Sequence, residues 1–138
     1  MDETAVESTT ETVTYGAPTL FSPLIYSATA QFQSHEDTAT HLLMLARRCE
    51  ALLARLPGPP SLPAARALLG FVHALAGSAG LYGFVRLAAQ AARFERAVEL
   101  DQAELPAPWA ELRASAGDTL DILETLVHYP VRTTGFDP

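Results

Sequence analysis

The spacing of apolar residues between prolines is the feature that most constrains the fold of this chain. One apolar stripe advances in steps of three and four residues, as Leu42, Leu45, Cys49, Leu52 and Leu56. That period places the stripe on one face of an α-helix. Ser34 with Asp37 three residues later is a variant of the capping box that marks helix starts. The proline-rich segment 57–60 cannot continue a helix. The sequence therefore predicts a helix that begins at Ser34 and ends before Pro57.

Three more segments have helical periodicity. The second helix is predicted to have Ser61 as its cap and to run to about Gly80. The third is predicted over about Phe84–Leu100. The fourth follows the loop Asp101–Pro108 and ends at Pro130. The inward stripes are Phe84, Leu87, Ala91, Phe94 and Val98 in the third, and Trp109, Leu112, Ala116, Leu120, Leu123 and Val127 in the fourth.

Four amphipathic helices with short connections predict an all-α fold, an antiparallel up-down four-helix bundle with an extra N-terminal segment. Residues 1–33 form this N-terminal extension, in which 1–16 have a polar, acidic composition typical of disorder. The apolar segment 17–33 is predicted to hold a short helix that lies against one end of the bundle. The bundle itself spans 34–130, and 131–138 form a C-terminal tail.

Composition narrows the function classes. The net charge is −7 and all nine cationic residues are arginine, so a phosphate-binding surface for nucleic acid is not expected. No apolar run approaches the ~18–20 residues of a membrane span, and the first residues lack the features of a secretory signal. The single cysteine, Cys49, excludes an internal disulfide. These features predict a cytoplasmic protein with no membrane partner.

His73 lies on a helical face that lacks bulky neighbours. At 100° per residue, the positions within about 60° of it are Arg66, Leu69, Gly70, Ala76, Gly77 and Gly80. The bulky Leu68, Phe71 and Leu75 lie roughly opposite. Because glycine within a helix costs about 1 kcal/mol relative to alanine, we interpret the cleared face as access for a large partner to a nucleophilic imidazole. Close packing of two helices through small residues is the alternative.

Glu95 falls inside the apolar stripe of the third helix, within about 20° of Phe84 and 40° of Ala91 on the wheel. A carboxylate in such a place needs a partner. With a turn near residues 81–82, an antiparallel hairpin makes the helix that carries His73 the natural neighbour of Glu95. Glu95 can then accept a hydrogen bond from Nδ1–H of His73, which leaves Nε2 as the nucleophile. A partly exposed glutamate at the edge of the stripe is the alternative.

These residues also carry a family resemblance. The segment HALAGSAGLYG (73–83) resembles the phosphoacceptor motif of histidine-containing phosphotransfer (HPt) domains. That motif has a leucine-like residue at +2 from the histidine, lysine at +3, glycine at +4, small residues at +5 and +6, and glycine at +10. The matching residues are His73, Leu75, Gly77, Ser78, Ala79 and Gly83. The family also has Gln or Glu at +22, where Glu95 stands. In helix number and order the resemblance covers 34–130, and its sequence-specific part covers 66–99.

The resemblance implies a role in two-component signalling. His73 would be the phosphoacceptor, would receive a phosphoryl group on Nε2 from a receiver-domain aspartate or a histidine kinase, and would pass it to another response-regulator receiver domain. Glu95 would orient the imidazole. The chain would need no cofactor of its own, because the partner receiver supplies Mg²⁺. It has no nucleotide-binding motif, so it would be a phosphotransfer intermediate with no kinase activity. The candidate docking residues are Leu69, Gly70, Ala76, Gly77 and Gly80.

One position departs from the family pattern. The lysine at +3, which in the family is thought to help hold the phosphoryl group, is Ala76 here. Arg66 or Arg86 could supply a cation instead. The departure favours an alternative function, in which a degenerate HPt-like bundle binds and regulates a receiver or kinase without being phosphorylated.

A metal-binding bundle is the third interpretation. Di-iron bundles use Glu-x-x-His pairs on facing helices, and the sequence has none. His35 and His41 do not share a helical face, and His128 lies near a helix end, so all three are predicted to be solvated surface residues. Cys49 falls in the inward stripe and is predicted to be a small buried hydrophobe. No metal site is expected.

Overall fold

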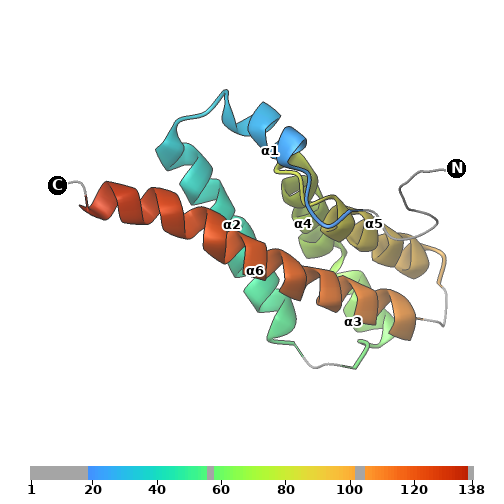
Figure 1. The fold of residues 1–138 in the computed structure, drawn as a ribbon. Helices are drawn as coiled ribbons and strands as arrows, with labels where there is room; N and C mark the ends of the chain where they lie inside the picture. Colours follow the sequence, from blue (N-terminus) through green and yellow to red (C-terminus); the bar gives the residue numbers. More distant parts are fainter. Residues whose placement is uncertain (1–18, 56–57, 102–104, 137–138) are drawn as a thin grey trace, which may run out of the picture.

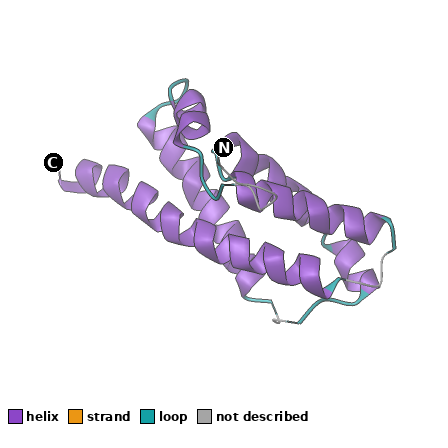
Figure 2. Ribbon diagram, turned by 45° about the vertical axis from the view of Figure 1, so that its right-hand side comes forward, coloured by secondary structure: helices purple, strands orange, loops and turns teal. Residues whose placement is uncertain are grey.

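All regular secondary structure in the described part of the chain is α-helical in the computed structural model (Figure 1, Figure 2). The described residues are 19–55, 58–101 and 105–136, the last nine of them as backbone only. The helices are α1 (Pro23–Ala30), α2 (His35–Leu53), α3 (Leu62–Ala67), α4 (Leu69–Leu81), α5 (Val85–Glu99) and α6 (Pro106–Phe136). The predicted all-α helical bundle is thereby confirmed.

The core lies between the four long helices. The most extensive contacts join α2 to α6 and α4 to α5, followed by α5 to α6, while the short α3 lies against α4 and α5 (Figure 1). The predicted inward positions that are buried are Leu42, Leu45, Cys49 and Leu52 on α2, all five of the stripe that begins at Phe84, and Trp109, Leu112, Ala116 and Leu123 on α6. Leu120 and Val127 are partly buried, and Leu56 lies outside the described residues.

Two helix starts are capped by serine, as predicted. The hydroxyl of Ser34 accepts a hydrogen bond from the N–H of Asp37 at 3.0 Å, and that of Ser61 accepts one from the N–H of Ala64 at 3.3 Å. Each cap satisfies one of the backbone donors that have no partner in the first turn of a helix. Local sequence therefore fixes where α2 and α3 begin.

The segment predicted as one helix from Ser61 to Gly80 is divided in two, so that prediction is wrong in this detail. Leu68 separates α3 from α4, with φ −88° and ψ −8°. Its N–H donates to the carbonyl of Ala65 at 3.0 Å, a tighter bond than the α-helical one. Leu68 and Ala65 are both buried. The interruption therefore allows a short helix to turn its apolar side chains into the core.

The fourth helix is longer at both ends than the sequence indicates. It starts at Pro106 and continues past Pro130 to Phe136, so the predicted end at Pro130 is wrong. The predicted tail 131–138 therefore begins as a continuation of α6. Proline in a first turn costs nothing, because that N–H has no helical partner. Within the helix, Pro130 lacks the N–H of one backbone hydrogen bond, and the helix nevertheless continues to Phe136.

The short helix predicted within 17–33 is present as α1 and lies against the end of the α4–α5 hairpin, as expected (Figure 1). Ser22 donates its N–H to the carbonyl of Gly83 at 2.7 Å, and the rings of Phe21 and Phe84 lie 4.8 Å apart. Gly83 has φ +89°, and a Cβ there would lie 2.5 Å from the carbonyl oxygen of Ser22. Only glycine fits this contact. The predicted disordered lead, 1–16, lies outside the described residues.

A buried tyrosine links three segments at the same end. The hydroxyl of Tyr82 donates to Oε1 of Gln33 at 2.8 Å and lies 2.6 Å from Nδ1 of His41. Because the phenol proton is committed to Gln33, His41 donates from Nδ1–H to the tyrosine oxygen. Thr38 also donates to Gln33, at 3.2 Å. His41 is exposed, as predicted, and it also has this structural hydrogen bond, which was not predicted.

Two further findings concern the described residues. None of their helices combines the length and the apolar character needed to cross a lipid bilayer.

Cys49 is a free thiol buried in the core, as its place in the apolar stripe predicts. Burial, followed by the nearby charge of Glu50, raises the pKa of the Cys49 thiol to about 12.

Candidate functional site

The hairpin of α4 and α5 brings His73 and Glu95 together. The two helices are joined by a short turn at residues 82–84 and pack along their length. His73 of α4 faces Glu95 of α5. Closer to the turn, Gly80 of α4 faces Ala88 of α5, since a Cβ at Gly80 would lie 3.7 Å from that of Ala88. Both pairs are equally spaced about the same point of the turn, as antiparallel packing requires. The predicted pairing of His73 with Glu95 is therefore present, although the turn lies at 82–84 and not near 81–82.

The imidazole is exposed while the carboxylate beside it is largely buried. Nδ1 of His73 lies 3.2 Å from Oε2 of Glu95, and the side chains are 83% and 17% exposed respectively. A carboxylate only accepts hydrogen bonds, so Nδ1 carries the proton and Nε2 of a neutral ring keeps its lone pair. Glu95 is partly exposed, as the alternative stated, and it also has His73 as its hydrogen-bond partner. Nε2 is thus the available nucleophilic atom.

The glycines beside the histidine leave open space. A Cβ added at Gly70 or at Gly77 would meet nothing within 4 Å, so neither glycine is required by helix packing. Gly80 differs, because it is partly buried against Ala88 of α5. The candidate docking residues Leu69 and Ala76 are also partly buried. On the opposite side of the helix, the buried residues are Leu68, Val72, Leu75 and Ala79, and Phe71 is partly buried.

The two arginines considered as substitutes for the family lysine both contact carboxylates. Arg66 belongs to α3 and forms an ion pair with Asp101. Arg86 lies 4.0 Å from a carboxylate oxygen of Asp118 on α6, so its side chain is directed toward α6, whereas Glu95 is directed toward α4. The structure therefore brings Glu95 to His73 and places Arg86 on another side of α5.

One contact of the motif was not predicted from the sequence. Arg48 of α2 donates from Nη1 to the hydroxyl of Ser78 at 2.9 Å, which ties α2 to the helix that carries His73. Ser78 was considered only as a small residue of the motif. Arg48 directly precedes Cys49 of the inward stripe. Its position at the edge of the buried face was the one feature of the sequence that could have indicated a contact with a neighbouring helix.

The described residues contain no group of three or more His, Cys, Asp or Glu side chains that could hold a metal ion. What the arrangement offers is a histidine nucleophile. Its orientation is set by a hydrogen bond to Nδ1, and its second nitrogen is open to a group carried by another molecule. Comparison of the chain with known protein families, with curated proteins and with solved structures gives no match.

Proposed function

We propose that this chain is a histidine phosphotransfer protein of a two-component phosphorelay, an HPt-like bundle that acts in the cytoplasm. His73 is the phosphoacceptor, and its partners are a histidine kinase or response-regulator receiver domains. The observation that supports this most directly is the open imidazole of His73 held at Nδ1 by the carboxylate of Glu95. A nucleophilic histidine requires an acid that orients its ring and a second nitrogen that is exposed. A histidine that only packs in the core requires neither.

The transfer step uses only these two side chains of the protein. The lone pair on Nε2 of His73 attacks the phosphorus of a receiver aspartyl phosphate, and the N–P bond forms as the P–O bond to aspartate breaks. The aspartate carboxylate is the leaving group. Nδ1 keeps its proton, and Glu95 stabilises the positive charge that develops on the ring. Passage to the next receiver is the same step in reverse. The Mg²⁺ required for charge neutralisation comes with the receiver.

Access for a receiver is consistent with the face around His73. Gly70 and Gly77 border open space, so a globular partner that approaches the imidazole meets no side chain at these two positions. Leu69, Ala76 and Gly80 would form the surrounding apolar contact. A surface of this kind is modest and suits a transient complex.

A second candidate function is favoured by one specific observation. Ala76 has no charge where the family has lysine, and Arg66, the nearest candidate in sequence before it, forms an ion pair with Asp101. A bundle with alanine at this position and with Arg66 paired to Asp101 could bind a receiver or kinase and regulate it without being phosphorylated.

Labelling with phosphoramidate, a small donor that phosphorylates histidine, tests the proposal without a known partner. The wild type should gain an N-linked phosphoryl signal in ³¹P NMR that is labile to acid, and His73→Gln should not. His35→Gln, at an exposed position of α2, is the matched control and should be labelled like the wild type. Equal labelling of the wild type and His73→Gln would exclude His73 as the acceptor.

A receiver domain then separates the two candidate functions. In transfer from a ³²P-labelled receiver, a relay protein removes the label in the wild type but not in His73→Gln. A regulatory binder instead holds the receiver equally well in both proteins and leaves the label in place.

A further inference from the structure

A groove of about 640 Å³ runs between α2 and α6. Its apolar residues are Leu43 and Ala46 on α2 and Leu120, Leu123 and Val127 on α6, and the other residues that line it are Arg47, Glu50, Asp121, Glu124 and Thr125. No residue of α4 or α5 takes part, so the groove shares nothing with the face around His73. It extends over eight residues of each helix, which is about two helical turns.

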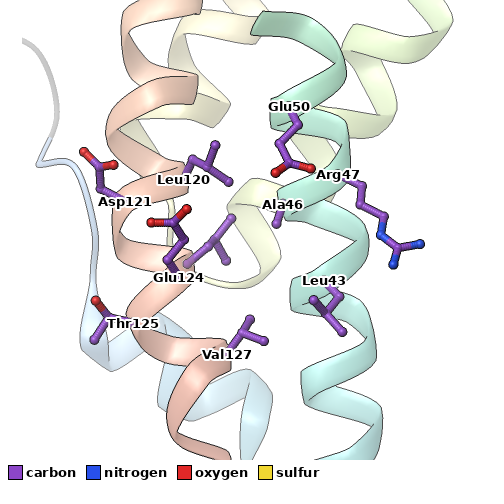
Figure 3. A pocket seen from close by; sticks show the side chains of 10 residues that line it. Leu43, Ala46, Arg47, Glu50, Leu120, Asp121, Glu124, Thr125 and Val127 are labelled. Carbon is purple, nitrogen blue, oxygen red and sulfur yellow. The ribbon is translucent and has the colours of Figure 1, made fainter. Parts of the chain in front are cut away.

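The rim of this groove is acidic. Figure 3 shows Ala46, Leu120 and Val127 directed into the space between the helices, with the carboxylate of Glu50 at its α2 edge. Glu124 is exposed on the α6 side, whereas the guanidinium of Arg47 points away from the groove. An apolar floor with a carboxylate on each side therefore faces solvent.

We propose that this groove binds an amphipathic helix of a partner protein, with an apolar stripe flanked by arginine or lysine. A helix laid along two others is a common mode of peptide recognition. The apolar stripe would cover Ala46 and Leu120, and cations on its flanks would meet Glu50 and Glu124. The charge on the rim selects this occupant, because complementary charge determines which partner is accepted.

The other occupants have the wrong charge. Residues 1–18 of the chain contain four acidic residues and no arginine, so the rim would repel them. A second copy has a net charge of −7 and presents the same acidic rim, so like charges would face each other. Binding of a cationic helix leaves the imidazole of His73 open, and the groove would anchor a partner while the other face remains free.

The test is an NMR titration of the ¹⁵N-labelled full chain with two synthetic peptides of equal length. Both have the same leucine and alanine stripe, flanked by arginine in one and by glutamate in the other. We expect saturable binding of the arginine peptide, with shifts at the amides of residues 43–50 and 120–127, and no binding of the glutamate peptide. His73→Gln should bind the arginine peptide as the wild type does.

Matched variants separate the rim from the general negative charge of the protein. The double variant E50Q/E124Q should weaken binding roughly fivefold, as expected for the loss of two exposed ion pairs. The double variant E36Q/E99Q removes the same charge from exposed positions outside the groove and should bind like the wild type. Equal weakening by both variants, equal binding of both peptides, or shifts outside the groove would overturn the proposal.

Two further measurements test the other possible occupants of the groove, a second copy of the chain and residues 1–18. Sedimentation of the chain alone as a dimer that Leu43→Glu, a charge placed on the apolar surface of the groove, dissociates would assign the groove to a second copy. Changes at the groove amides on deletion of residues 1–18 would assign it to the chain's own N-terminal segment. Either result would overturn the proposal, whereas a monomer with unchanged groove amides supports it.

Discussion

Nδ1 of His73 lies 3.2 Å from Oε2 of Glu95, although the histidine is 83% exposed and the glutamate 17%. The two side chains belong to different helices of one hairpin, so the packing of α4 on α5 sets their distance. The ring is thus oriented from the protein side, while its other nitrogen faces solvent. Glu95 therefore controls the orientation of the imidazole, while the exposed side of His73 controls the access of a partner. Each of the two can be altered by itself.

Removal of the Glu95 carboxylate should change the tautomer of His73. In Glu95→Ala the proton is expected to move to Nε2, which removes the nucleophilic lone pair. Phosphoryl acceptance should fall roughly tenfold to a hundredfold, the range found when the group that orients a histidine is lost. The ¹⁵N shifts of the imidazole nitrogens report the tautomer directly. Glu95→Gln, whose carbonyl also accepts a hydrogen bond, should restore both readouts, and a tautomer unchanged in Glu95→Ala would refute the pairing.

Bulk at Gly77 should block the partner and leave the fold intact. A Cβ there would meet nothing within 4 Å, and a better helix former than glycine should raise stability by up to about 1 kcal/mol. We expect Gly77→Leu to unfold at the same or a higher temperature and to lose transfer from a receiver. Ala74→Leu, at an exposed position on another side of α4, is the control. Full transfer in Gly77→Leu would show that the glycine serves no steric purpose.

Restoring the family lysine should distinguish a slow relay protein from a regulatory binder. Ala76 is partly buried next to the histidine face, and a lysine there can extend its ammonium group toward a phosphoryl group on Nε2. In a relay protein Ala76→Lys should accelerate labelling by a phospho-receiver, whereas Ala74→Lys, with the same added charge, should not. Identical rates in both variants would argue against a role for the missing cation.

Alanine at position 83 should destabilise the end of the bundle. Gly83 has φ +89°, and a Cβ would lie 2.5 Å from the carbonyl of Ser22. Gly83→Ala should lower the free energy of unfolding by about 2 kcal/mol and increase hydrogen exchange at Ser22, whose N–H donates to Gly83. Gly70→Ala, in open space within a helix, should have the opposite sign by about 1 kcal/mol. Stability of Gly83→Ala equal to wild type would contradict this contact.

The Cys49 thiol should make stability depend on alkaline pH. Its pKa is raised from 9.0 to about 12 by burial and by Glu50, so the unfolded chain loses this proton at a lower pH than the folded one. The contribution is fully present below pH 9 and is lost as pH rises toward 12. Denaturant unfolding of the wild type and Cys49→Ala should show a steeper loss in the wild type across this range. Parallel pH dependence would indicate an accessible thiol.

Much of the fold follows from local sequence, for a physical reason. Helical periodicity is set by the backbone, so the stripes that begin at Leu42 and Phe84 identify the buried faces correctly. Serine caps at Ser34 and Ser61 act within one turn and are equally local. The pairing of His73 with Glu95 could be predicted because a short turn joins their helices, whereas the exact register depends on the position of that turn, which lies at 82–84.

The rest depends on contacts between distant segments. The interruption at Leu68 buries a side chain in a core made by other helices, and nothing in its own neighbours indicates it. The hydrogen bond of Arg48 to Ser78 joins residues 30 positions apart. Continuation of α6 past Pro130 runs against the local preference of proline. The groove between α2 and α6 combines two helices that are far apart in sequence.

The hydrogen bonds of Tyr82 have a mechanical consequence. They join the segment that follows α1, through Gln33, and the first turns of α2, through His41, to the tip of the hairpin that carries His73. Removal of that one phenol would break both bonds to the hairpin, while the bonds of Thr38 to Gln33 and of Ser22 to Gly83 would remain. The turn between α4 and α5 is thus fixed to the segments around it. A protein that docks at His73 would therefore contact a hairpin that is held in place at its turn.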